Sequence, residues 1–164
     1  ARRFAVRLTE GEAVFMKILV AIDGSENALR ALDHSIDLAG RLDEKSELVL
    51  INVHDDAALH SASRALGSNA VKDYLSDLSQ EQLAGALTKA EASGVPFEKV
   101  IATGPISATI VNEAETRQVE LIVLGTHGRR GVRRALMGSD AEQIVRQAPV
   151  PVLLVRSADD QPAG

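Results

Sequence analysis

The residues best suited to chemistry form a glycine-rich run from Gly125 to Ser139. The run reads Gly-Thr-His-Gly-Arg-Arg-Gly-Val-Arg-Arg-Ala-Leu-Met-Gly-Ser, so its glycines follow the spacing G-x2-G-x9-G-S. Glycine lets backbone amides approach an anion without a Cβ in the way. Gly138 and Ser139 stand where we expect a helix to begin, and free N–H groups at such a point favour phosphate. The run is therefore a candidate phosphate cradle.

Two better-known phosphate motifs do not fit this chain. Gly-Lys-Ser and Gly-Lys-Thr, which end a Walker A loop, occur nowhere in the sequence. The glycine-rich run also comes late in the chain, whereas the dinucleotide-binding fingerprint follows the first strand of its fold. The candidate cradle must therefore belong to another class.

Charge is unevenly distributed along the chain. The sequence has 18 Lys and Arg against 23 Asp and Glu, and this net charge of -5 argues against general binding to nucleic acid. Four basic residues nevertheless lie between Gly128 and Gly138, namely Arg129, Arg130, Arg133 and Arg134. They could attract a polyphosphate, or they could form a solvated loop that offsets the acidic remainder.

Short apolar runs that alternate with helical patterns predict the elements that position this loop. We expect strands at 18–22, 48–53, 97–103, 121–124 and 152–155. We expect helices from Ser25 to Gly40, from about 70 to Ser93, from Gly104-Pro105 onward and from Ala141 to Ala148, with a connection at 55–69. Such alternation requires crossover connections, so the fold class is α/β, a doubly wound five-stranded parallel sheet with helices on both faces, Rossmann-like.

Composition and length favour one domain. The 164 residues are 45% hydrophobic and 2% aromatic, so the core must be aliphatic, as in a buried parallel sheet. We expect a single domain over 16–156, an accessory or disordered N-terminal extension over 1–15, and a polar tail over 157–164. No apolar run approaches the roughly 18 residues of a membrane span. The absence of cysteine fits a cytoplasmic location.

Ligands of doubly wound sheets lie beyond the carboxyl ends of the strands, which directs attention to four short segments. These are Asp23 to Ser25, Val53 to Asp55, Thr103 to Pro105, and the run from Gly125. Asp23 could contact a ligand there or cap the first helix. His127 lies in the glycine-rich run, and a backbone or solvent role suits it better than a general base. The four histidines are too scattered for a zinc site.

Three stretches make the chain resemble the universal stress protein family. They are Lys-Ile-Leu-Val-Ala-Ile-Asp-Gly-Ser-Glu-Asn-Ala from Lys17, the residues around Gly104, and Gly-Thr-His-Gly…Gly-Ser…Ala-Pro-Val-Pro-Val-Leu-Leu-Val-Arg at the end. The resemblance covers about 16–156. It implies strand order 3-2-1-4-5, a cytoplasmic homodimer and, for the subclass with this glycine spacing, ATP binding.

The resemblance also implies roles for particular residues. Asp23 would contact the nucleoside, and the Val53 backbone would meet the adenine. The glycines would hold the ribose and phosphates. The full cofactor-binding set is Ala21, Asp23, Val53, Gly104, Gly125, His127, Gly128, Arg129, Gly138, Ser139, Asp140 and Ala141. The dimer would pair through Val150, Val152 and Leu154 of the last strand, whose apolar edge also invites pairing.

Asp140 and Ala141 depart from the family pattern, which commonly has a small residue and then Ser or Thr. Ala141 cannot donate a hydroxyl to a terminal phosphate, and Asp140 adds a negative charge beside it. A Mg²⁺ ion between the groups could reverse that repulsion. AMP or ADP binding, or a requirement for Mg²⁺, therefore stands beside simple ATP binding.

The function hypothesis is an adenine-nucleotide-binding, stress-response regulatory homodimer. Bound nucleotide would change the loops at 55–69 and 126–137 and so a surface for a protein partner that the sequence does not identify. No nucleophile, base and metal set converges, so we expect no catalytic residue and at most weak ATP hydrolysis. The alternatives are a slow Mg²⁺-dependent hydrolase or phosphotransferase, and a nucleotide-free dimeric scaffold.

Overall fold

A computed structural model describes residues 15–42, 45–55, 68–126 and 137–156. The five strands are β1 (Phe15–Ala21), β2 (Lys45–His54), β3 (Phe97–Thr103), β4 (Leu121–Gly125) and β5 (Val152–Val155). They form one sheet in the order β3-β2-β1-β4-β5, and every neighbouring pair is parallel. The predicted α/β fold and strand order are confirmed. β1 and β2 begin earlier than the apolar runs suggested.

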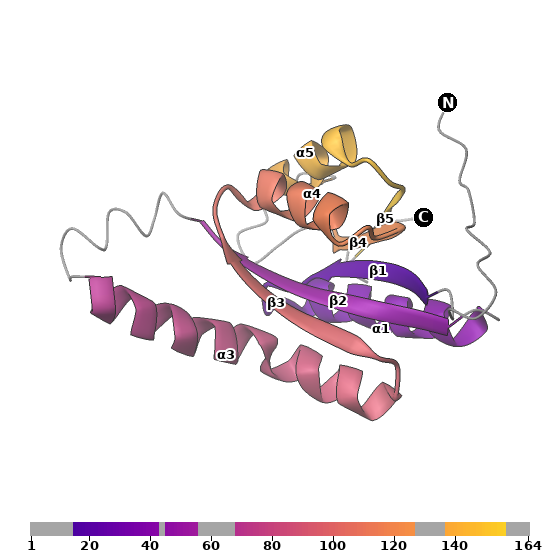
Figure 1. The fold of residues 1–164 in the computed structure, drawn as a ribbon, viewed down its shortest axis with the longest axis horizontal. Helices are drawn as coiled ribbons and strands as arrows, with labels where there is room; N and C mark the ends of the chain where they lie inside the picture. Colours follow the sequence, from indigo (N-terminus) through magenta and orange to yellow (C-terminus); the bar gives the residue numbers. More distant parts are fainter. Residues whose placement is uncertain (1–14, 43–44, 56–67, 127–136, 157–164) are drawn as a thin grey trace, which may run out of the picture.

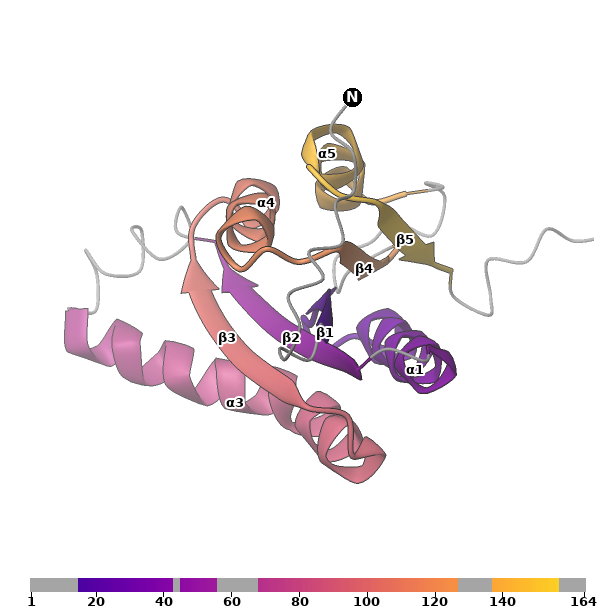
Figure 2. The ribbon, with the colours of Figure 1, turned by 45° about the vertical axis from the view of Figure 1, so that its right-hand side comes forward.

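Two pairs of helices cover the two faces of this sheet, as Figures 1 and 2 show. The helices are α1 (Glu26–Arg41), α3 (Ser68–Ser93), α4 (Ile106–Thr116) and α5 (Ser139–Gln147). The helices α1 and α3 lie on one face, and α4 and α5 lie on the other. In both views the N-terminal turns of α3 extend beyond the carboxyl ends of β2 and β3.

Local sequence explains where three of these helices begin. Ser25 caps α1 because its side chain accepts a hydrogen bond from the N–H of Ala28. The helix α4 starts at Ile106, and Pro105 is its N-cap, just outside the helix. Proline makes no side-chain cap hydrogen bond there. The helix α5 starts at Ser139, whereas the sequence pattern pointed to Ala141.

The expected connection at 55–69 is shorter at its C-terminal end, because Ser68 and Asn69 belong to α3. Residues 56–67, 1–14 and 157–164 lie outside the described residues. No helix in the described ranges is long and apolar enough to cross a membrane.

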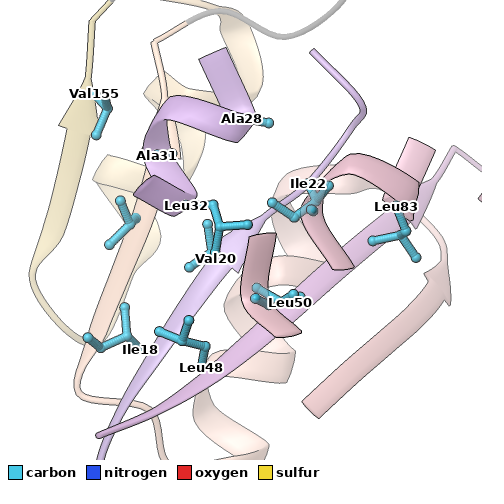
Figure 3. Close-up of a cluster of buried hydrophobic side chains, with 13 residues drawn as sticks. Ile18, Val20, Ile22, Ala28, Ala31, Leu32, Leu48, Leu50, Leu83 and Val155 are labelled. Atoms are coloured by element: carbon cyan, nitrogen blue, oxygen red, sulfur yellow. The ribbon is translucent and has the colours of Figure 1, made fainter. Parts of the chain in front are cut away.

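The core consists of one aliphatic layer on each side of the sheet. Ile18, Leu19 and Val20 of the central strand β1 are each 0% exposed, which explains their continuous apolar run. Ile18 and Val20 lie on the face covered by α1 and α3, in one cluster with Leu32 of α1 and Leu83 of α3 (Figure 3). Leu19 faces the opposite layer, beneath α4 and α5. Burial on both faces fixes β1 rigidly, so the turn that follows it has a stable base.

Candidate functional site

The carboxyl ends of β1 and β4 lie side by side at the centre of the sheet. β1 pairs with β2 on one side and with β4 on the other, so the strand order reverses there. Doubly wound sheets bind ligands at such a point. Asp23 follows β1, and Gly125 ends β4. The structure thus brings two of the predicted segments to one edge.

Asp23 organises the turn between β1 and α1. Its Oδ1 accepts hydrogen bonds from the backbone N–H of Ser25 at 3.0 Å and from the Ser25 hydroxyl at 2.6 Å. Ser25 Oγ in turn accepts from Ala28 N–H at 3.2 Å. Ser25 is therefore the helix cap, and Asp23 orients it. The two roles considered for Asp23 are compatible, and its contact with a ligand remains a prediction.

Gly125 has a packing role that sequence analysis missed. A Cβ at this position would lie 2.8 Å from Asn27 Cβ and 3.0 Å from the Asn27 backbone carbon. The end of β4 therefore approaches α1 too closely for any side chain. This requirement explains the glycine whether or not it also contacts a ribose.

The glycine-rich loop is closed at its base. Gly138 N–H donates to the Thr126 carbonyl oxygen at 2.8 Å, so the loop leaves β4 and enters α5 at one place. Gly138 is the N-cap of α5 and makes no side-chain cap hydrogen bond. The amides of the first turn are thus not covered by a capping side chain, and Ser139 there is exposed. His127, Gly128 and the four arginines lie outside the described residues.

Asp140 brings negative charge to the first turn of α5. Partial burial raises the pKa of its carboxyl above the ordinary value, and repulsion by the Asp55 carboxylate raises that pKa further. Asp55 follows the end of β2, so two acidic groups from different elements lie near one another. Among the described residues, no group of three or more His, Asp or Glu could hold a metal on its own.

Ala141 points away from this edge. Its side chain is 8% exposed and packs in the core layer beneath α4 and α5. Any contact that Ala141 makes with a ligand must therefore use its backbone.

The remaining predicted residues surround the ends of β1, β2 and β3. Ala21 and Val53 are half-buried in β1 and β2. Gly104 is buried after β3, and its N–H donates to the His54 carbonyl oxygen at 3.0 Å. Its φ of +145° favours glycine, and a Cβ there would lie 2.6 Å from Thr109 Oγ1, so the threonine side chain would also have to move.

Two polar pairs between β2 and α3 were missed in the sequence. Asn52 Nδ2 donates to Gln82 Oε1 at 2.8 Å, and His54 Nε2 lies 2.6 Å from Ser79 Oγ. Burial lowers the pKa of His54 below its ordinary value because the charged ring would lose solvation. The available signal was the presence of polar residues in a strand that is otherwise buried and apolar.

The comparisons with known proteins agree with this architecture. A model of the universal stress protein family matches residues 15–156. Universal stress protein MJ0531 of Methanocaldococcus jannaschii is 32% identical over 149 residues, which cover 91% of this chain and 86% of that protein. The solved structure of MJ0577, from the same organism, is similar with a TM-score of 0.77 and 27% identity, over 89% of this chain and 99% of that one.

Two more distant structures share the fold and contain adenine nucleotides. A universal stress protein in complex with cAMP has a TM-score of 0.59 and 22% identity, over 87% of this chain and 97% of that one. A family protein from Arabidopsis thaliana with AMP bound has a TM-score of 0.61 and 21% identity, over 90% of this chain and 97% of that one.

Proposed function

The chain belongs to the universal stress protein family, and from that membership we propose that it is a cytoplasmic regulatory protein that binds an adenine nucleotide. The observation that carries the proposal is the Gly138–Thr126 hydrogen bond, which sets the base of the glycine-rich loop at the strand edge that also carries Asp23. The cAMP and AMP complexes of more distant family members support the choice of ligand.

In this proposal Asp23 and the Val53 backbone bind the nucleoside, and the loop and the first turn of α5 bind the phosphates. The Gly138 N–H is used by the Thr126 carbonyl oxygen, so the amides that suit an anion are those of the first turn from Ser139 onward, where no side chain caps the helix and its dipole is positive. The arginines of the loop add positive charge to a chain whose net charge is -5.

The preference among ATP, ADP and AMP depends on Asp55 and Asp140. Their mutual repulsion supports a site in which a long phosphate chain requires a cation. The two carboxylates would hold Mg²⁺ together with phosphate oxygens, and the ion would neutralise the charge of the phosphate tail. Without Mg²⁺, AMP should bind with a smaller electrostatic penalty than ATP.

We further propose a homodimer that pairs through β5. The strand β5 lies at one edge of the sheet and exposes Leu153 at 41%, with Val150, Val152 and Leu154 partly buried beside it. The opposite edge strand, β3, also exposes a large apolar residue, Ile101 at 49%, but it exposes the charged residues Glu98 and Lys99 as well. Charged residues discourage strand pairing, so β5 is the better dimer edge. Nucleotide binding would then act on a partner protein through the loop between Thr126 and Gly138.

The direct test combines copurification and thermal shift. Mass spectrometry of the denatured protein should identify AMP, ADP or ATP in the supernatant. Saturating nucleotide at 100 times its dissociation constant should add about 2.7 kcal/mol to stability. No copurified nucleotide and no shift with ATP, ADP, AMP or cAMP, with and without Mg²⁺, would favour the nucleotide-free scaffold.

The second candidate is a slow Mg²⁺-dependent ATP hydrolase or phosphotransferase, and the pair Asp55 and Asp140 is the observation that favours it. Single-turnover consumption of ATP separates the two. A rate near the usual enzyme median of about 10 per second would refute the regulatory binder.

A further inference from the structure

Asn52 is an exception in the most buried part of the sheet. Side chains two residues apart in a strand point to the same face, so Asn52 lies on the face of β2 that carries Leu48 and Leu50 and packs under α1 and α3. Asn52 is only 1% exposed. Burying an amide costs free energy unless its polar atoms are paired. Asn52 Oδ1 has no hydrogen-bond partner within the described ranges. Stability alone therefore gives a weak reason for asparagine at this position.

Both hydrogen bonds of the Asn52 side chain are donated by its Nδ2 atom. That atom donates to the Ile22 carbonyl oxygen at 2.7 Å and to Gln82 Oε1 at 2.8 Å. Both partners are acceptors, so rotating the amide by 180° would place oxygen against two oxygens. The orientation of Asn52 is thus determined by its partners. Its amide links the ends of β1 and β2 to α3.

Asn52 and Gln82 hold the turn that carries Asp23 on both sides of that residue, at Ile22 and at Gly24. Ile22, the residue before Asp23, also donates its N–H to the Ile51 carbonyl oxygen at 2.8 Å, so both backbone groups of Ile22 are fixed by β2. Gly24 follows Asp23 with φ +81°, and a Cβ there would lie 3.1 Å from Gln82 Cα. The backbone of Gln82 therefore forms the surface against which the turn packs.

A second polar pair anchors α3 one turn away. His54 Nε2 lies 2.6 Å from Ser79 Oγ, and Ser79 is 1% exposed. Asn52 and His54 are two residues apart on one face of β2, and Ser79 and Gln82 are three apart on one face of α3. The helix is thus kept in register with the carboxyl edge of the sheet by polar contacts.

We propose that Asn52 and Gln82 are positioning residues for the nucleoside. They would hold the turn that carries Asp23 at a fixed distance from β2. At that distance Asp23 and the Val53 backbone would contact the same nucleoside. This inference rests on the proposed function, and it predicts which end of the ligand the pair affects. Loss of the pair should weaken adenosine, AMP and ATP by the same factor, because the phosphates are held elsewhere.

The test uses substitutions that separate stability from position. Asn52→Leu has nearly the same shape, but it removes the donor of both hydrogen bonds as well as the buried unpaired oxygen, so the melting temperature should fall, and affinity is measured well below that temperature. Affinity for adenosine, AMP and ATP should each fall about tenfold. Gln82→Met should weaken binding similarly. Gln82→Glu keeps an acceptor for Asn52 Nδ2, so it should bind adenosine as well as the unaltered protein does. Gln80→Met, at an exposed position of α3, is the matched control.

The outcomes distinguish this inference from the proposed function. If the unaltered protein binds no adenine nucleotide, the proposed function fails. If it binds, and Asp23→Ala weakens binding while Asn52→Leu and Gln82→Met do not, the function stands and the positioning role is refuted. A loss for Asn52→Leu that grows with the number of phosphates would also refute it. Should Asn52→Leu fail to fold, the Gln82 variants decide the question.

Discussion

The backbone N–H of Gly138 lies 2.8 Å from the carbonyl oxygen of Thr126, so the last glycine of the loop is joined to the residue that follows β4. This contact needs no side chain at either residue. It places the start of α5 at the strand edge that carries Asp23, although the intervening sequence is long. A phosphate held by the amides of α5 would therefore lie near the turn after β1.

We expect Gly138→Val to block nucleotide binding and to leave the fold intact. Gly138 has φ -71° and ψ 155°, a conformation that valine adopts readily, so little strain should result. The branched side chain would cover the amides that the phosphate needs. The check is calorimetric titration beside a thermal melt. Gly40→Ala, at an exposed position of α1 where a Cβ meets no atom within 4 Å, is the control. Unchanged affinity in Gly138→Val would mean that the phosphates bind elsewhere.

Replacing Asp140 by Asn should stabilise the ligand-free protein at neutral pH. The pKa of Asp140 is raised in the folded state, so the folded protein binds more protons than the unfolded chain as pH rises through that range. Ionised Asp140 thus costs stability above its folded pKa and costs nothing below the ordinary value of 3.8. The gain in melting temperature for Asp140→Asn should disappear below about pH 4. A gain that persists in acid would exclude the electrostatic cause.

The same substitution should change ligand preference. Without Mg²⁺, Asp140→Asn should tighten ATP more than AMP if the proposed site is correct, because only the longer phosphate chain would extend toward the carboxylate. With Mg²⁺ the difference should shrink or reverse, since the ion would lose a ligand. Titrations of ATP and AMP with EDTA or with Mg²⁺ measure this. Equal effects on both nucleotides would remove Asp140 from the phosphate end of the site.

Sequence patterns predicted the scaffold well because burial dictates composition. The fully buried residues 18–20 of β1 and 122–123 of β4 could hardly be read as anything but central strands. Helix boundaries were less accurate: α5 begins at Ser139, since a glycine N-cap with acidic residues in the first turn is enough to start it. The resemblance to a known family supplied the strand order.

The polar contacts that shape the site could not be predicted in this way. Asn52 meets Gln82 across 30 positions of sequence, and no local pattern reports such a pairing. The resemblance implies that Gly125 contacts the ribose and phosphates, which stays a prediction, whereas its close approach to Asn27 depends on how β4 packs on α1. Both features arise from tertiary packing, which period and propensity do not encode.

Acid should destabilise the protein through His54. The folded state lowers the pKa of this buried ring, so the unfolded chain takes up a proton first as pH falls below about 6.5. Stability should therefore decline from that pH until the folded pKa is reached. Urea melts between pH 5 and pH 8 should show this decline in the unaltered protein and less of it in His54→Gln. His34→Gln, on the exposed side of α1, should keep the full decline.

A charge on β5 should break the homodimer, whereas the same change on the opposite edge should not. Leu153 and Ile101 are large hydrophobic residues on the two edge strands, 41% and 49% exposed, so glutamate at either should cost the monomer little. Leu153→Glu would put like charges at a β5–β5 interface, where burial of an unpaired carboxylate is costly. Light scattering should give a monomer for Leu153→Glu and a dimer for Ile101→Glu. If Ile101→Glu is the monomer, the dimer edge is β3, and the charged residues Glu98 and Lys99 would then have to pair across it.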